Sequence, residues 1–130
     1  MKDKAEVIIR VLLGLALIVF GLDKFFQFVP HGHEMTEELI AAYNGLLANK
    51  FIMPTVGIVE IISGLLLVSG RYLIVAFGAM IPIAYSILGF HIAVDIHGIL
   101  PGLIVALLLG YLIWYRRSAI SKILRSVDHV

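Results

Sequence analysis

The sequence predicts an all-α membrane protein with four transmembrane helices in an antiparallel bundle and a short amphipathic helix in the first outer loop. Hydrophobic residues make up 61% of the 130 residues, charged residues only 15%, and the mean hydropathy is +1.03. A soluble domain is typically about half apolar and about a quarter charged, so lipid is the expected solvent. Long apolar stretches recur along the chain, and basic residues gather on connections that an even number of crossings places on one side.

The expected spans cover residues 7–29, 51–69, 72–94 and 99–115, within a single transmembrane domain that comprises residues 1–130. At 1.5 Å per residue, each span has about the length needed to cross roughly 30 Å of hydrocarbon. The first span follows two lysines, as in a signal peptide. It is longer than the apolar region of a signal peptide and no small-residue cleavage site follows, so we expect it to be retained.

The loop after the first span contains a pattern typical of a short surface helix, over residues 36–49. Thr36 is a suitable N-cap, and Glu37 and Glu38 complement the helix dipole in the first turn. Apolar residues then recur on one helical face. We expect this amphipathic helix to lie on the outer membrane surface or to cap the bundle.

Basic residues determine the expected orientation. They lie before the first span, in the short second connection and after the last span: Lys2, Lys4, Arg10, Arg71, Arg116, Arg117, Lys122 and Arg125. The opposite loops are mainly acidic. We therefore expect a multi-pass protein of the cell (inner) membrane, with the lipid bilayer as its solvent and both termini cytoplasmic.

The overall charge and the cysteine count exclude several classes of function. Ten basic residues balance nine acidic ones, so nothing favours a nucleic-acid partner. The absence of cysteine excludes disulfides, thiolate metal sites and dithiol redox chemistry on this chain.

Charged residues inside the expected spans mark the candidate site, because a charge in a span costs about 2.5 to 3.5 kcal/mol and normally faces a partner. One face of the first span carries Arg10, Gly14, Leu17, Gly21 and Lys24, and one face of the second carries Gly57, Glu60 and Gly64. Glycines at this spacing allow close helix contact, so Glu60 is expected to point into the helix interface.

Depth along the spans favours a Lys24–Glu60 pair, with Arg10 as a second partner for Glu60 and Asp23 as a competitor for Lys24. Two interpretations remain open. In the first, Lys24, Glu60 and His91 line a ligand-binding pocket in the outer half of the bundle, with Arg10, Asp23 and Asp95 as further candidates. In the second, the ion pair only fixes the register of the helices.

Histidines gather toward the expected outer face, at His31, His33, His91 and His97, near Asp95. These residue types bind zinc or copper. Their spacing matches no standard metal motif, and we predict surface histidines and no metal site. No catalytic residue is predicted either, because nucleophile-elbow, phosphate-loop and dinucleotide motifs are absent from the sequence.

Three sequence elements resemble the DoxX-like family of small bacterial membrane proteins. The first begins at Arg10 and ends in Phe20-Gly21-Leu22-Asp23-Lys24-Phe25-Phe26. The second runs from Val59-Glu60 through Gly64 to Gly70-Arg71. The third contains Pro82 and ends in Phe90-His91, before Asp95.

The resemblance implies a four-helix membrane bundle, with the family's polar positions at Arg10, Lys24, Glu60 and His91. Some relatives are subunits of quinone-reducing thiosulfate oxidation systems, and others are associated with oxidative-stress defence assemblies. We therefore expect a redox-associated subunit or a protein that binds a small quinone-like ligand, and not an enzyme on its own. No cofactor is predicted beyond such a quinone, and the expected partners are membrane or redox proteins or a second copy of the chain. A small transporter or channel subunit, and a non-catalytic scaffold, are the alternatives.

Overall fold

The chain is helical throughout the part that the computed structural model describes, residues 2–30 and 34–128. Its elements are α1 (Lys2–Phe26), α2 (Glu37–Ala48), α3 (Ile52–Ser69), α4 (Leu73–Val94), the 3-10 turn η1 (Ile96–Gly98), α5 (Leu100–Tyr115) and α6 (Arg117–Asp128). The prediction of an all-α chain is confirmed. The helices follow the predicted segments closely, except that α1 begins before residue 7 and ends before residue 29, and that α6 was not predicted.

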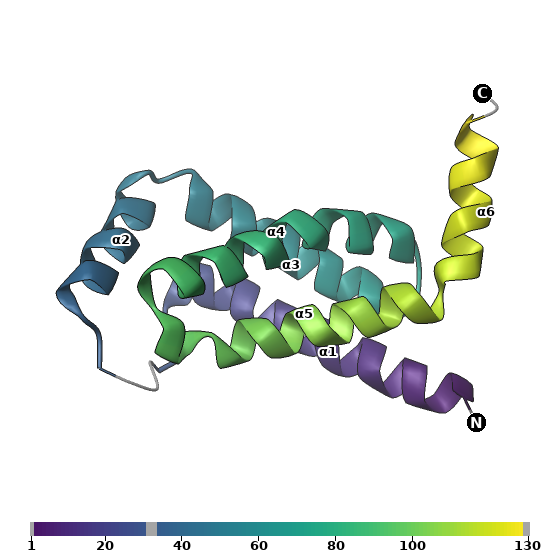
Figure 1. The fold of residues 1–130 in the computed structure, drawn as a ribbon, viewed down its shortest axis with the longest axis horizontal. Coiled ribbons are helices and arrows are strands. Elements are labelled where there is room, and N and C mark those ends of the chain that lie inside the picture. Colours follow the sequence, from purple (N-terminus) through teal and green to yellow (C-terminus); the bar gives the residue numbers. More distant parts are fainter. Residues whose placement is uncertain (1, 31–33, 129–130) are drawn as a thin grey trace.

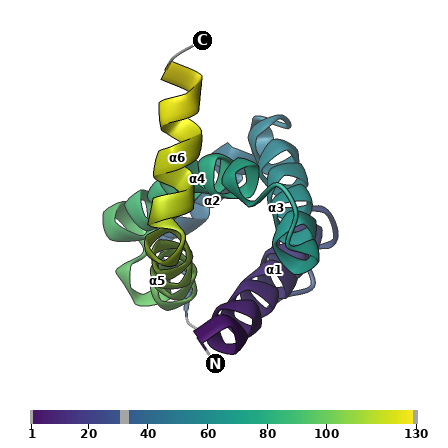
Figure 2. The ribbon, with the colours of Figure 1, turned by 90° about the vertical axis from the view of Figure 1, so that its right-hand side faces the viewer.

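Four helices form a ring in which α1 packs on α3, α3 on α4, α4 on α5 and α5 back on α1. Figure 1 shows that successive helices of this ring run in opposite directions, and Figure 2 shows the ring end-on. The contact between α1 and α3 is the most extensive. Helix α2 contacts α3 and α4 at the end of the ring where α1 ends, and α6 leaves the opposite end.

Local backbone signals explain where the helices begin and end. Helix α1 stops because Gln27 takes a left-handed conformation (φ 50°). Thr36 caps α2 as predicted, since its Oγ1 accepts a hydrogen bond of 3.1 Å from the Leu39 amide. Before α3, the Asn49 Oδ1 accepts a hydrogen bond of 3.0 Å from the amide of Ile52, the first residue of the helix. Gly70 (φ 76°) ends α3 with a left-handed turn.

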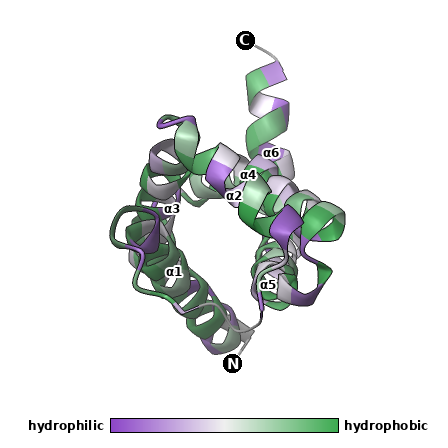
Figure 3. Ribbon diagram, turned by 90° about the vertical axis from the view of Figure 1, so that its left-hand side faces the viewer, coloured by the Kyte–Doolittle hydropathy of each residue, from purple (hydrophilic) through white to green (hydrophobic). Residues whose placement is uncertain are grey.

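The ring encloses a core of apolar side chains, among which Leu67, Ala76, Met80 and Leu112 are fully buried. Large apolar side chains also cover the outer surfaces of α1, α3, α4 and α5. Figure 3 shows hydrophobic residues along most of α1 and α5. A surface of this kind is stable in lipid and not in water.

Three helices are long and apolar enough to cross a membrane: α1, α3 and α4. The fourth candidate is the pair α5 and α6. Together these helices are long and apolar enough to cross a membrane, but they are bent by 70° at Arg116. The fold therefore has three or four candidate membrane spans.

Candidate functional site

The site is positioned by glycines that bring the backbones of α1 and α3 together. A Cβ atom at Gly64 would lie 2.5 Å from the carbonyl oxygen of Gly14, and one at Gly21 would lie 2.7 Å from that of Gly57. No real side chain tolerates such distances, so the close packing requires glycine at these positions. This role of the glycines was predicted from the sequence. The contact fixes the position of α1 along the axis of α3.

This register places Lys24 of α1 beside Glu60 of α3. The Lys24 Nζ lies 2.9 Å from the Glu60 Oε1, in an ion pair whose side chains are 18% and 1% exposed. The predicted Lys24–Glu60 pair is therefore present. Its lysine end reaches the protein surface and its carboxylate end is enclosed, so Lys24 is the more accessible member of the pair.

The hydrogen bonding of this pair is incomplete. The Lys24 Nζ donates to the Phe20 carbonyl at 3.3 Å. The Glu60 Oε1 is buried and has no donor in hydrogen-bond geometry among the described residues, although the ammonium is close to it. Burying a charge without a full set of hydrogen bonds is costly, which makes the pair an unusual feature of this apolar bundle.

Two cavities meet at the ion pair. The larger, of about 310 Å³, lies between α1, α2, α3 and α4 and is bordered by Lys24, Tyr43, Met53, Val56, Ser86 and Phe90. The smaller, of about 150 Å³, is bordered by Lys24 and Glu60 together with Leu17 and Phe20 of α1, Ile87 of α4 and the first half of α5. Lys24 borders both cavities, so it is the shared polar group of the site.

Asp23, the residue before Lys24, makes a local contact. Its Oδ1 accepts a hydrogen bond of 2.7 Å from the Val29 amide and thereby holds the chain that leaves α1. The expected competition between Asp23 and Glu60 for Lys24 is thus replaced by a local contact.

His91 is paired within its own helix turn. Its Nδ1 lies 3.1 Å from the Asp95 Oδ2, and its ring packs edge-on against Phe90. His91 borders neither cavity at the ion pair. His31 and His33 lie outside the described residues. Within the described part of the chain, no three histidine, aspartate or glutamate side chains come close enough together to hold a metal ion.

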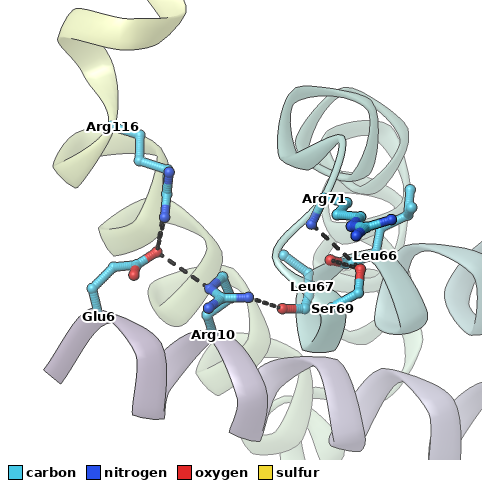
Figure 4. A network of polar contacts seen from close by, with 7 residues as sticks. All are labelled: Glu6, Arg10, Leu66, Leu67, Ser69, Arg71 and Arg116. Carbon is cyan, nitrogen blue, oxygen red and sulfur yellow. Dashed lines mark hydrogen bonds and ion pairs between the residues drawn. The ribbon is translucent and has the colours of Figure 1, made fainter. Parts of the chain in front are cut away.

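Arg10 belongs to a second polar cluster, at the end of the ring where the chain begins (Figure 4). Its Nη1 donates to the Leu67 carbonyl at 2.6 Å, in the last turn of α3, where helix carbonyls lack intrahelical partners. Its Nε lies 3.6 Å from the Glu6 Oε1. Arg116 approaches the same carboxylate oxygen at 2.9 Å and 2.8 Å.

Glu6 was not predicted from the sequence as a residue of any site. It is only 2% exposed, and its carboxylate forms ion pairs with both Arg10 and Arg116. The spacing of Glu6 and Arg10, one helical turn apart, was the available signal. That signal is weak, because a charged residue so near the N-terminus is ordinarily solvated.

The fold and the buried pair define a multi-pass helical membrane protein whose charges are enclosed between apolar helices. The family model DoxX matches residues 5–92, which contain most of α1, all of α2 and α3, and most of α4. The chain therefore belongs to the DoxX family. The matched range includes Arg10, Asp23, Lys24, Glu60 and His91, whereas Asp95 and α5 follow it. No curated protein and no solved structure gives a significant match.

Proposed function

We propose that this DoxX family protein binds a small amphipathic ligand of the quinone class beside Lys24, as a redox-associated subunit of the cell membrane. One observation carries the proposal: Lys24 reaches an apolar cavity of about 310 Å³ while its charge is balanced by the buried Glu60. The volume falls at the lower end of ligand pockets, which are mostly apolar with a few polar groups.

The chemistry of the lining suits a quinone headgroup. A lysine ammonium has three protons to donate, and the contacts of Lys24 with the Phe20 carbonyl and Glu60 leave one of them for a ligand. A quinone carbonyl would accept a hydrogen bond from this ammonium, and its ring and isoprenoid tail would pack on residues such as Val56 and Phe90. The hydroxyl of Ser86, which donates to the Pro82 carbonyl at 2.8 Å, adds a second polar point on the same cavity.

The proposal includes a topology of four crossings with both ends cytoplasmic. Helix α5 has 16 residues, about 24 Å at 1.5 Å per residue, and η1 and Ile99 extend it toward the outer boundary. The charged residues of α6 would cost about 2.5 to 3.5 kcal/mol each in hydrocarbon, so α6 is excluded from the span. The basic residues at the Arg116 end of the ring support a cytoplasmic location for that end.

Binding is tested with a short-chain ubiquinone or menaquinone analogue added to the purified protein in mild detergent. A ligand at about 100 times its Kd stabilises the folded protein by about 2.7 kcal/mol, which is read as a rise in Tm. Val56→Phe should fill the cavity and abolish this rise. Its matched control is Ile58→Phe, two residues along α3 on the exposed surface, which should keep it.

A rise in Tm that is equal in both variants, or no rise with any quinone, would contradict the proposal. Lys24→Met should also abolish the rise, whereas removal of the exposed lysine by Lys50→Met should not.

A transport role is the second candidate, because Glu60 borders the 150 Å³ cavity on the α5 side of the ion pair. A carboxylate beside a cavity within a span is the usual element of a proton or cation path. Proton or cation flux into proteoliposomes that stops in Glu60→Gln would favour it. Unchanged flux in Glu60→Gln would exclude the transport role. A non-catalytic scaffold would instead keep its partner complexes intact in the double variant Glu60→Gln with Lys24→Met.

A further inference from the structure

Helix α6 has two chemically different faces. Its apolar side chains are Ile120, Ile123, Leu124 and Val127, at intervals of three and four residues, so they share one face. The basic residues Arg117, Lys122 and Arg125 and three serines occupy most of the remainder, with Asp128 as the acidic residue.

The apolar face of α6 is largely uncovered. Ile120, in the first turn, packs partly against the core of the ring. Beyond it Ile123, Leu124 and Val127 are 45%, 55% and 61% exposed, and no described residue of α6 is buried. The outer two turns of this face therefore have no cover from the part of the protein that the structure describes.

The bend at Arg116 turns α6 by 70° from the direction of α5. Figures 1 and 2 show α6 projecting away from the ring instead of folding back on it. A helix that leaves a membrane-crossing helix at this angle lies near the plane of the membrane surface. This step rests on the proposed crossing by α5, and it does not depend on quinone binding.

Contacts on both sides of the bend hold this direction. Arg116 is anchored to the buried Glu6 of α1 by contacts of 2.9 Å and 2.8 Å. The guanidinium of Arg117 lies 4.4 Å from the centre of the Trp114 ring and donates to the Trp114 carbonyl at 2.8 Å. Trp114 is itself exposed, and tryptophan is enriched at the depth of the lipid headgroups. The bend thus lies where a membrane–water boundary is expected.

We propose that α6 is an in-plane anchor that binds anionic phospholipids of the cytoplasmic leaflet. Its apolar face enters the boundary between headgroups and acyl chains, and Arg117, Lys122 and Arg125 contact the phosphate groups. A helix with one apolar face and a polar face rich in lysine and arginine is typical of this mode of binding. Three basic residues against one acidic residue give the charge complementarity that an anionic leaflet requires. A leaflet is also the surface that α6 meets as it leaves α5.

The test uses the full-length protein in bilayers, with single cysteines introduced into α6 for nitroxide labels. The chain has no cysteine of its own, so each label is unique. In bilayers that contain phosphatidylglycerol, labels on Leu124→Cys and Val127→Cys should be accessible to oxygen and protected from a water-soluble nickel reagent. The matched labels on Ser121→Cys and Ser126→Cys should show the reverse, with a helical period along the scan.

The contribution of charge is tested with Lys122→Gln and Arg125→Gln. Each basic residue near an anionic surface strengthens binding about fivefold, so the double variant should lower the docked-to-undocked ratio about thirtyfold. Bilayers of phosphatidylcholine alone, or high salt, should reproduce this loss.

Three results would overturn the proposal: equal water accessibility around α6, protection that does not depend on anionic lipid, or protection that appears only as protein density rises. The last would assign the face to a second copy of the chain. The rise in Tm on addition of a quinone is measured on the same α6 variants and should equal that of the unmodified protein. Failure of the anchor is therefore distinguishable from failure of the ligand site.

Discussion

The carboxylate of Glu6 joins Arg116, a residue 110 positions later in the chain, in a contact that ties the first turns of α1 to the end of α5. Arg10 approaches the same carboxylate at 3.6 Å, so one buried acid is shared by two cations. The contact closes the ring between its first and last helices.

Glu6→Gln should destabilise the protein by about 1 to 3 kcal/mol, because it leaves both arginines without this counter-charge. The value lies below that for a fully buried pair, since about a third of the Arg116 side chain is exposed. Unfolding in a detergent titration measures the change. Glu34→Gln, at an exposed position before α2, is the control and should change stability by less than about 0.5 kcal/mol.

Lys24 and Glu60 should show strong coupling in a double-mutant cycle. Lys24→Met or Glu60→Gln alone leaves one uncompensated group and should cost about 3 to 5 kcal/mol, whereas the double variant should cost less than either. The same unfolding titration measures all three variants. Strictly additive losses would show that the two groups do not stabilise each other.

Gly64→Ala should destabilise the contact between α1 and α3 by about 1 to 3 kcal/mol, the usual cost of overpacking, because its Cβ would lie 2.5 Å from the Gly14 carbonyl oxygen. Gly78→Ala in α4 is the matched control, since a Cβ there meets nothing within 4 Å. That control should keep or raise the Tm, because alanine favours a helix over glycine. Equal effects of the two substitutions would contradict the role given to the glycine contact.

Asp23 is expected to act through its acceptor oxygen and not through its charge. Asp23→Asn keeps an oxygen for the Val29 amide and should retain stability and quinone binding, whereas Asp23→Ala should cost about 1 kcal/mol. Thermal unfolding with and without a quinone separates the two effects. Loss of quinone binding in Asp23→Asn at unchanged stability would instead assign the charge to the ligand site.

Part of this arrangement could be predicted from the sequence, because helical periodicity relates residues that lie far apart. The glycines and the charged residues share faces of two apolar segments, which was enough to predict the Lys24–Glu60 pair. The N-cap Thr36 was equally local and equally predictable.

The rest depends on contacts that periodicity does not encode. His91 contacts Asp95 one turn away and does not border the cavities at the ion pair, because a nearby carboxylate competes with a distant site. Arg10 contacts the end of α3 and Glu6. Its guanidinium lies against Gly70, where a Cβ atom would be only 2.7 Å from the Arg10 Nη1. Helix α1 begins before the predicted span, at Lys2, because hydropathy locates the hydrocarbon part of a helix and not its charged first turns.

The partnership of α1 with α3 also has a consequence for biogenesis. Lys24 enters the bilayer with α1, but its counter-ion Glu60 is synthesised only after the loop and α2. During that interval the ammonium group must be solvated by water, lipid headgroups or the insertion machinery. The insertion of α3 completes the ion pair and replaces that temporary environment of Lys24. Glu60 is therefore expected to influence the efficiency of membrane insertion as well as the stability of the folded protein.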